Sequence, residues 1–525
     1  MIERVIENWL DNVNERGYET AFCQALTAQG HRIIRRPAHG GTEHGKDIVS
    51  RDKRGTYHAY QLKTGNLGKS EWRSIRDEVT ELVEVPIHEP GVPAAQRFTP
   101  HLVANGRITD PVSHEINLRN TQWEHRGYEP LDLILKDDLF RIFVDLQGNF
   151  LPTAPQDFET FLRLYLAEKR AFLDKDAFAS FLVSFLPIGK KLKKSDLSRL
   201  FAGTAILANY VLSGFQRAGN HIAVCEGWIL VIAHLLRVAE NAAFMTSWRQ
   251  SLDLVIQSWE AAAMDLAKES TESPNWIEGE VSTDHFVFPY RQVILTGYLA
   301  TVAIYKRLTT GRLAEEDQIL DTINRHRGGT FWGESATPFA FAVMWFLLQR
   351  GQEQRVVDIA ADLIKLIATL NHHKQPVGLP DPYYDSQAII KQAAMGQRIF
   401  GYHQSFTGRS FSIRPLVEFL VRLGHKRLLR SLWYDITEVD YVEFVPDDSR
   451  DIYLWRIAKG MDVRRRWGRP ESWVDLLERA EAKSVPTCIM ITHYPQLVLP
   501  FLLVYPQRLT ADLTRFIERR IRQQF

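Results

Sequence analysis

The chain has 525 residues, a hydrophobic content of 45%, a charged content of 24% and a formal net charge of +1 at pH 7. This length is enough for two or three domains with large buried cores. The near-neutral charge excludes a protein that binds nucleic acid through bulk positive charge. The three cysteines, Cys23, Cys225 and Cys488, lie far apart and form no Cys-x-x-Cys motif, which argues against a disulfide framework and a zinc ribbon. A reducing, cytoplasmic setting is therefore expected.

No targeting segment and no membrane span are expected. The first residues, MIERVIENWLDNVNERG, have the pattern of an amphipathic acidic helix rather than of a signal peptide. The uncharged segment Cys488 to Gln507 contains three prolines and a histidine. These residues favour a buried helical segment over a transmembrane helix.

The first 150 residues show the pattern of an α/β domain. Two helices are predicted between Ile2 and Gly30, and residues 31–36 are typical of a first strand. Two short β-rich runs, Asp47 to Val49 and Tyr57 to Lys63, are separated by a charged turn and indicate a hairpin. A helix, a strand, a helix and a strand follow at residues 71–85, 101–105, 110–120 and 131–135. This order predicts an α/β sandwich with a mixed central sheet.

The predicted hairpin collects chemically useful side chains at one edge. Gln61 and Lys63 are two residues apart and share a face of their strand, and Asp47 projects at the same edge if the strands pair. A carboxylate and an amide oxygen are ligands that Mg²⁺ accepts, and a lysine can stabilise developing negative charge. Glu19, on the upstream helix, is the candidate for a further acidic ligand. The fragment Asp…Gln-x-Lys alone is also compatible with ordinary charges on a surface hairpin.

The order Glu19, Gly45-Lys46-Asp47 and Gln61-Leu62-Lys63 resembles the restriction-endonuclease-like nucleases, in particular the Mrr type. The resemblance covers roughly the first 150 residues. It implies that Glu19, Asp47 and Gln61 hold a Mg²⁺ or Mn²⁺ ion and that Lys63 serves the attacking water. Many relatives have Glu at the position of Gln61, and Gln is usual in the Mrr type.

The region around this motif is basic. Residues 31–69 contain nine Lys or Arg against three acids, a local balance of +6. A basic patch beside a metal site suits a polyanionic substrate. We therefore expect contacts with DNA from five cations, Lys46, Arg51, Lys53, Arg54 and Lys69. A solvated hairpin surface is the alternative interpretation.

Beyond a boundary at residues 148–157 the strand signals nearly vanish. Apolar residues recur at helical spacing in many segments from Phe158 to Leu423, joined by short polar loops. This favours a large all-helical array or solenoid over residues 156–525, without a fixed-period repeat that would identify a repeat family. The expected organisation is a nuclease domain at 1–150 followed by a helical sensing or assembly domain.

Together these patterns predict a metal-dependent endonuclease that hydrolyses phosphodiester bonds of double-stranded DNA. The architecture resembles effectors of bacterial restriction and antiphage defence, in which a nuclease is joined to a regulatory part. We expect the helical domain to form a homo-oligomer or to bind a partner protein. Two alternatives stay open, namely a structure-specific repair or junction nuclease and a non-catalytic scaffold that only binds DNA.

Overall fold

The structure is a computed structural model of the 525-residue chain. It describes residues 2–36, 44–94, 96–147, 155–166, 172–189, 193–242, 246–272, 288–325, 331–371, 377–395, 407–456, 460–468, 471–482 and 487–523. The chain divides into two compact units, Met1–Trp259 and Glu260–Phe525. The predicted boundary near residue 150 thus falls within the first unit, and most of it lies outside the described residues.

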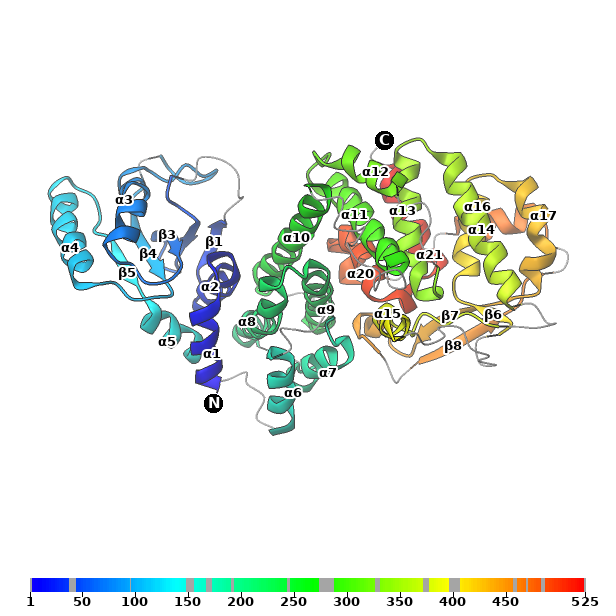
Figure 1. The fold of residues 1–525 in the computed structure, drawn as a ribbon, viewed down its shortest axis with the longest axis horizontal. Coiled ribbons are helices and arrows are strands. Elements are labelled where there is room, and N and C mark those ends of the chain that lie inside the picture. Colours follow the sequence, from blue (N-terminus) through cyan, green and yellow to red (C-terminus); the bar gives the residue numbers. More distant parts are fainter. Residues whose placement is uncertain are drawn as a thin grey trace. The chain divides into compact units, whose positions relative to one another are not determined.

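The first unit is built on a five-stranded mixed sheet, which confirms the predicted fold class of this region (Figure 1). The strands are β1 (Arg32–Arg35), β2 (Ile48–Arg51), β3 (Tyr57–Lys63), β4 (Phe98–Ala104) and β5 (Asp132–Ile134), in the spatial order of their numbering. β1, β2 and β3 are antiparallel, whereas β3, β4 and β5 are parallel. The parallel pairs need crossover helices, which explains the alternation of helix and strand after residue 68.

Among the described residues, five helices accompany the sheet. They are α1 (Ile2–Asn12), α2 (Glu15–Gln29), α3 (Lys69–Glu84), α4 (Asp110–His125) and α5 (Lys136–Gln147). The helices α3 and α4 cover one face, where Trp72, Val79 and Ile116 pack with Ala59 and Leu102 of the strands. The opposite face is covered by α2, whose Phe22 ring lies 5.4 Å from the ring of Tyr60 on β3. The sheet is therefore buried on both faces, as parallel sheets are.

The helix α2 is defined at both ends by local sequence. The Asn14 side chain caps it by accepting a hydrogen bond from the Gly17 N–H, and Gly30 ends it with φ of 93°. Its residues are buried from Gly17 to Thr27. An amphipathic surface helix buries only one face, so α2 is enclosed on more than one side.

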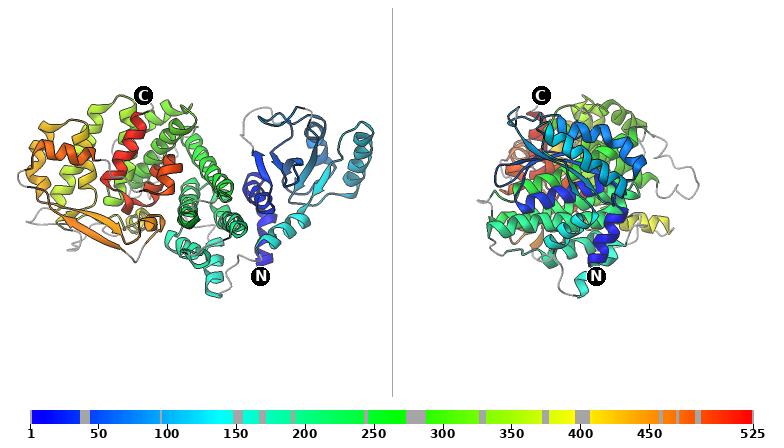
Figure 2. Two further views of the ribbon diagram at one scale, coloured as in Figure 1. Left: turned by 180° about the vertical axis from the view of Figure 1, so that it is seen from behind. Right: turned by 90° about the vertical axis from the view of Figure 1, so that its left-hand side faces the viewer.

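The side of α2 that does not face the sheet packs against the helical part of the first unit. This part contains α6 (Pro155–Tyr165), α7 (Lys175–Phe185), α8 (Lys194–Arg217), α9 (His221–Ala239) and the start of α10 (Arg249–Glu272). The helix α2 packs against α8 (Figure 2), and the Asn209 side chain donates to the Gly17 carbonyl at 2.8 Å. The α/β region and these helices therefore share one core.

The second unit is mainly helical but not wholly so. Its helices are α11 (Phe288–Thr309), α12 (Glu316–Arg325), α13 (Thr337–Gln349), α14 (Glu353–Asn371), α15 (Ser386–Ala394), α16 (Ile413–Arg422), α17 (Lys426–Thr437), α18 (Trp473–Glu481), α19 (Ile489–His493), α20 (Val498–Val504) and α21 (Ala511–Arg522). Short 3-10 helices occur at Glu240–Ala242 in the first unit and at Glu334–Ala336, Ser449–Tyr453, Pro495–Leu497 and Pro506–Arg508 in the second.

A small sheet corrects the expectation that residues 156–525 are all helical. Its strands are β6 (Arg409–Ser410), β7 (Asp440–Pro446) and β8 (Gly460–Arg465), with β7 in the middle. The segment Asp440–Pro446, DYVEFVP, is rich in β-branched and aromatic residues, which favour strands. The prediction missed it because the surrounding helical signals are much longer.

One helical segment, His221–Ala242, is long and apolar enough by composition to cross a membrane, and 94% of its most apolar window is buried inside the structure. Burial of this kind is typical of the core helix of a soluble protein. The run Cys488–Gln507 forms short helices, and all residues of α20 within it are buried. This agrees with the predicted buried helical segment.

Candidate functional site

The open ends of the β2–β3 hairpin bring Asp47 beside the last residues of β3. Ile48 pairs with Tyr60, so Asp47, one residue earlier, lies opposite Gln61. The Asp47 N–H donates to the Tyr60 carbonyl at 2.9 Å, and the Asp47 carboxylate accepts from the Leu62 N–H at 2.6 Å. The predicted meeting of Asp47 with the Gln-x-Lys segment is therefore present.

A glycine allows this segment to approach α3. Gly45 has φ of 68°, and a Cβ atom there would lie 2.2 Å from the Glu78 carbonyl oxygen. A side chain is thus excluded by both backbone conformation and space. The close contact places Asp47, two residues later, near the middle of α3.

Gln61 and Lys63 point to the face of the sheet that α3 covers, where Glu78 meets both. The Gln61 Nε2 donates to the Glu78 carboxylate at 2.7 Å, and the Lys63 ammonium lies 2.9 Å from the same oxygen. Lys63 is 20% exposed and Glu78 is 52% exposed as side chains. The site therefore opens to solvent on the side of α3.

The side-chain oxygen of Gln61, unlike its amide nitrogen, has no hydrogen-bond partner among the described residues. Gln61 is 2% exposed, and its Oε1 is buried without a hydrogen-bond partner among the described residues. A buried acceptor without a donor is unfavourable, and a hard cation is one ligand that satisfies it. With the Asp47 carboxylate beside it, the donor set fits a Mg²⁺ or Mn²⁺ ion.

Glu15 adds a carboxyl group that the sequence analysis missed. Burial raises the pKa of Glu15 to about 7, with Lys63 acting in the opposite direction and the carboxylates of Asp47, Glu19 and Glu78 adding to the rise. These influences place Glu15, in the first turn of α2, within electrostatic reach of the site. The signal in the sequence is its spacing of four residues from Glu19, which puts both on one face of the helix.

The charge of Lys63 is preserved despite burial. Burial by itself lowers the pKa of the Lys63 ammonium, but its hydrogen bond to Glu78 and the negative charges of Glu15, Glu78 and Asp47 outweigh it and raise that pKa. The main chain at Lys63 is fixed as well, because the Tyr18 hydroxyl of α2 donates to the Lys63 carbonyl at 2.8 Å. Lys63 is thus a cation whose main chain is fixed by α2 and whose ammonium is fixed by Glu78 of α3.

Glu19, the predicted upstream ligand, has a different partner in this structure. It is 4% exposed and accepts a hydrogen bond from the Nε of Arg36, just after β1. Among the described residues no three carboxylate, imidazole or thiolate groups converge on one point. Glu19 is therefore close to the other acids but engaged with a guanidinium.

The predicted DNA-contacting residues are spread over the domain. Arg51, Lys53 and Arg54 lie at or beside the turn of the hairpin, and Arg51 pairs with Tyr57 at the start of β3. Lys63 lies at the other end of β3, six residues after Tyr57 and about 20 Å along the strand. The cations of the hairpin turn are consequently not adjacent to Asp47 and Lys63. A DNA duplex about six base pairs long, at 3.4 Å per pair, spans the distance between the turn and Lys63.

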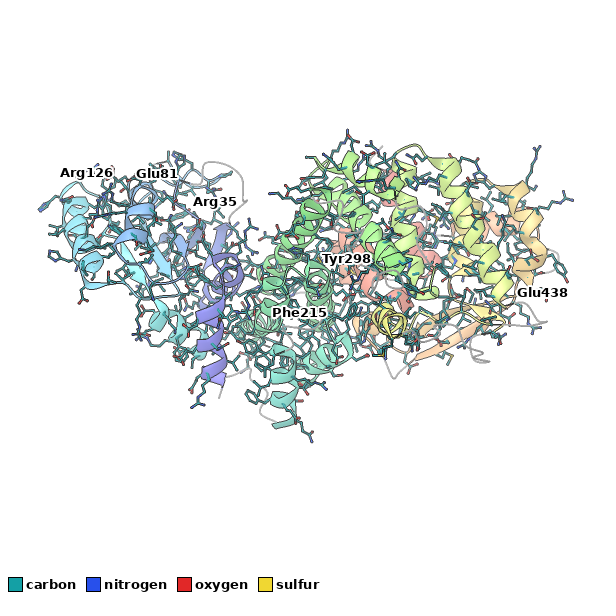
Figure 3. The ribbon with its side chains drawn as sticks, in the orientation of Figure 1. Arg35, Glu81, Arg126, Phe215, Tyr298 and Glu438 are labelled. Carbon is teal, nitrogen blue, oxygen red and sulfur yellow. The ribbon has the colours of Figure 1, made fainter. Side chains whose placement is uncertain are left out.

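The other two predicted cations differ in exposure. Lys46 is 2% exposed, and its ammonium donates to the Glu81 carbonyl at 3.0 Å. Glu81 lies on α3, where Figure 3 labels it. Burial lowers the pKa of Lys46 to about 8. Lys46 thus ties the segment before β2 to α3, whereas Lys69 is exposed at the start of α3.

Comparisons of this chain with models of known families, with curated proteins and with solved structures find no match. The assignment of the site therefore depends on its residues and their geometry.

Proposed function

We propose that the chain is a metal-dependent endonuclease that hydrolyses phosphodiester bonds of double-stranded DNA. In this proposal the α/β region is a restriction-endonuclease-like domain of the Mrr type. The observation that carries the proposal is the meeting of Asp47, Gln61 and Lys63 at one edge of the sheet, with the Gln61 Oε1 buried and unpartnered among the described residues. Phosphodiester hydrolysis needs oxygen ligands for a hard cation beside a fixed positive charge.

Each residue has a role that follows from its position. Asp47 and Gln61 would hold a Mg²⁺ or Mn²⁺ ion with their side-chain oxygens. A bound ion of this kind neutralises charge on the scissile phosphate and lowers the pKa of a coordinated water. The Lys63 ammonium orients the attacking water and stabilises negative charge that develops on the phosphate oxygens.

The two acids that flank Lys63 complete the arrangement. Glu78 holds the Lys63 ammonium and the Gln61 amide at once, so it fixes both side chains in one orientation. Glu15 approaches from α2 with a raised pKa, which makes its carboxyl group able to exchange a proton near neutral pH. We assign Glu78 to positioning and Glu15 to metal binding or proton transfer.

The test is cleavage of supercoiled plasmid by the purified full-length chain with Mg²⁺ or Mn²⁺. Asp47→Ala is expected to reduce cleavage by about 100-fold or more, because a metal ligand is lost. Asp52→Ala is the matched control, since Asp52 lies at the turn of the same hairpin and its substitution leaves the site intact. Equal cleavage by parent and Asp47→Ala would refute the assignment.

The same assay separates the alternatives. A non-catalytic scaffold binds DNA and cuts none with either protein, whereas a structure-specific repair nuclease cuts branched DNA in preference to plain duplex. We further propose that the protein acts in the cytoplasm as a regulated effector of restriction or antiphage defence. Residues 156–525 would mediate homo-oligomerisation or docking of a partner protein, because helical arrays offer extended surfaces for such contacts.

A further inference from the structure

A buried polar network joins α2 to α10. The Thr20 and Ser258 hydroxyls are 2.9 Å apart, and the Gln24 Nε2 donates to the Ser251 carbonyl at 2.8 Å. All four residues are buried. Polar groups in a low-dielectric core are costly to separate from their partners. A displacement of α10 must therefore either move α2 or break these hydrogen bonds.

Arg36 extends this network to the acid of the candidate site. Its guanidinium pairs with Glu19 through Nε and donates through Nη2 to the Thr20 hydroxyl at 2.6 Å. Its Nη1 reaches α10, at 3.3 Å from the Leu254 carbonyl and 3.4 Å from the Ser258 hydroxyl. The orientation of Arg36, and with it that of Glu19, depends on contacts with α10.

The helix α10 continues beyond the residues of this network. The helix is one element, Arg249–Glu272, and the division between the two units falls within it, after Trp259. Ser258 belongs to the first unit, whereas Glu260 belongs to the second, where it pairs with Lys306 of α11. A displacement of α10 acts on Arg36 through Leu254 and Ser258, both of which belong to the first unit.

We infer that Arg36, held by α10, is a restraint that withholds Glu19 from the metal ion of the nuclease site, and that displacement of α10 releases Glu19 to bind it. This inference rests on the proposed function. Glu19 is one helical turn from Glu15 and on the same face of α2. The carboxylate of Glu19 therefore has two competing cations, a guanidinium in the restrained state and a divalent metal ion in the released state.

The competition predicts a measurable coupling. If the released state is minor, the apparent dissociation constant for metal equals the intrinsic constant divided by the fraction of molecules that are released. Removing a hydrogen bond that favours only the restrained state then tightens metal binding. By reciprocity, metal binding loosens the contacts of α10 with α2.

The experiment is a calorimetric titration of the full-length chain with Mn²⁺. Ser258→Ala removes the hydroxyl that contacts both Thr20 and Arg36. Thr20→Val removes the contact with Ser258 and the hydrogen bond from the Arg36 Nη2. Each variant is expected to bind Mn²⁺ about three- to tenfold more tightly than the parent, which is the fold-change that the loss of one or two net hydrogen bonds gives. The binding must disappear in Asp47→Ala.

Ser251→Ala is the matched control. It is the same substitution two turns earlier in the same helix, and it keeps the main-chain carbonyl that binds Gln24. The Ser251 hydroxyl has no partner among the described residues, so this variant is expected to bind Mn²⁺ like the parent. A second readout is hydrogen exchange, because Mn²⁺ should speed exchange at the main-chain amides of residues 251–258.

The outcomes separate this inference from the function on which it rests. Mn²⁺ binding that depends on Asp47 but is equal in the parent, Ser258→Ala and Thr20→Val would overturn the restraint alone. Weaker binding in both variants would also overturn it, because the network would then support the metal site. No Mn²⁺ binding that depends on Asp47 in any of the proteins would overturn the proposed function, and the restraint with it.

Discussion

Glu334 provides a quantitative test of the core of the second unit. It begins the short helix Glu334–Ala336 and is 3% exposed. Its Oε2 accepts from the Phe411 N–H at 2.7 Å, and its Oε1 has no partner among the described residues. Burial raises the pKa of this carboxyl group to about 8, with Asp381 adding to the rise and the bonds to Ser410 and Phe411 opposing it. Glu334 is therefore protonated in the folded chain at neutral pH.

The cost to stability follows from linkage. Between the unfolded pKa of 4.5 and the folded pKa of about 8, the folded state binds more protons than the unfolded state, so the free energy of unfolding falls as the pH rises. A pH of 7 lies about 2.5 units above the unfolded pKa of Glu334. At 1.36 kcal/mol per unit, keeping the buried carboxyl group protonated at this pH costs about 3 kcal/mol of stability. Glu334→Gln keeps the shape of the side chain and removes the ionisation.

The assay is guanidinium denaturation of parent and variant at pH 5 and pH 8. We expect Glu334→Gln to match the parent within about 1 kcal/mol at pH 5 and to be more stable by about 4 kcal/mol at pH 8, which lies about 3.5 units above the unfolded pKa. Glu418→Gln is the control, because Glu418 is equally buried but lies against Arg414 and Arg422. It should lose about 3–5 kcal/mol. A difference between parent and Glu334→Gln that does not change with pH would refute the reasoning.

Three further predictions concern the first unit. Asn105→Ala should lower the free energy of unfolding by about 2–4 kcal/mol in denaturant titrations, because the buried amide makes three hydrogen bonds to main-chain groups. Burial, with the charge of a neighbouring histidine, lowers the pKa of His31 to about 4, so the parent should lose stability as the pH falls from 6.5 to 4. His31→Gln should lose about 1–2 kcal/mol less over that window in thermal or chemical melts, because solvent screens this partly exposed ring. Charge reversal at Arg51, Lys53 and Arg54 should weaken DNA binding equally for all sequences and flatten its salt dependence, and an unchanged slope in binding titrations would place the turn away from DNA.

Much of the first unit was predictable from local patterns. The hairpin of β2 and β3 follows from two short β-rich runs around a charged turn, and Gly30 ends α2 as its place after the apolar run indicates. The spacing of Gln61 and Lys63 predicted their common face, which the contacts of both with Glu78 confirm. Each of these inferences depends on residues close together in the sequence.

The remaining features depend on contacts that sequence spacing does not encode. Glu78 meets Lys63 because the Gly45 segment packs closely on α3, and Arg36 meets Glu19 because β1 and α2 pack side by side. The burial of α2 on two sides depends on α8, which is nearly two hundred residues away in the chain. The Asn209 bond to α2 shows why the first unit extends past residue 150.

The most direct test of the account is the rate of plasmid cleavage by Lys63→Ala with Mn²⁺, measured beside the parent and Lys53→Ala. Lys63 is held by Glu78 beside Asp47, whereas Lys53 lies at the turn of the same hairpin. We expect Lys63→Ala to cut at least about 100-fold more slowly than the parent. We expect Lys53→Ala to stay within a few-fold of the parent, because it loses only one of several expected phosphate contacts. Cleavage by Lys63→Ala at the rate of the parent would contradict the central claim.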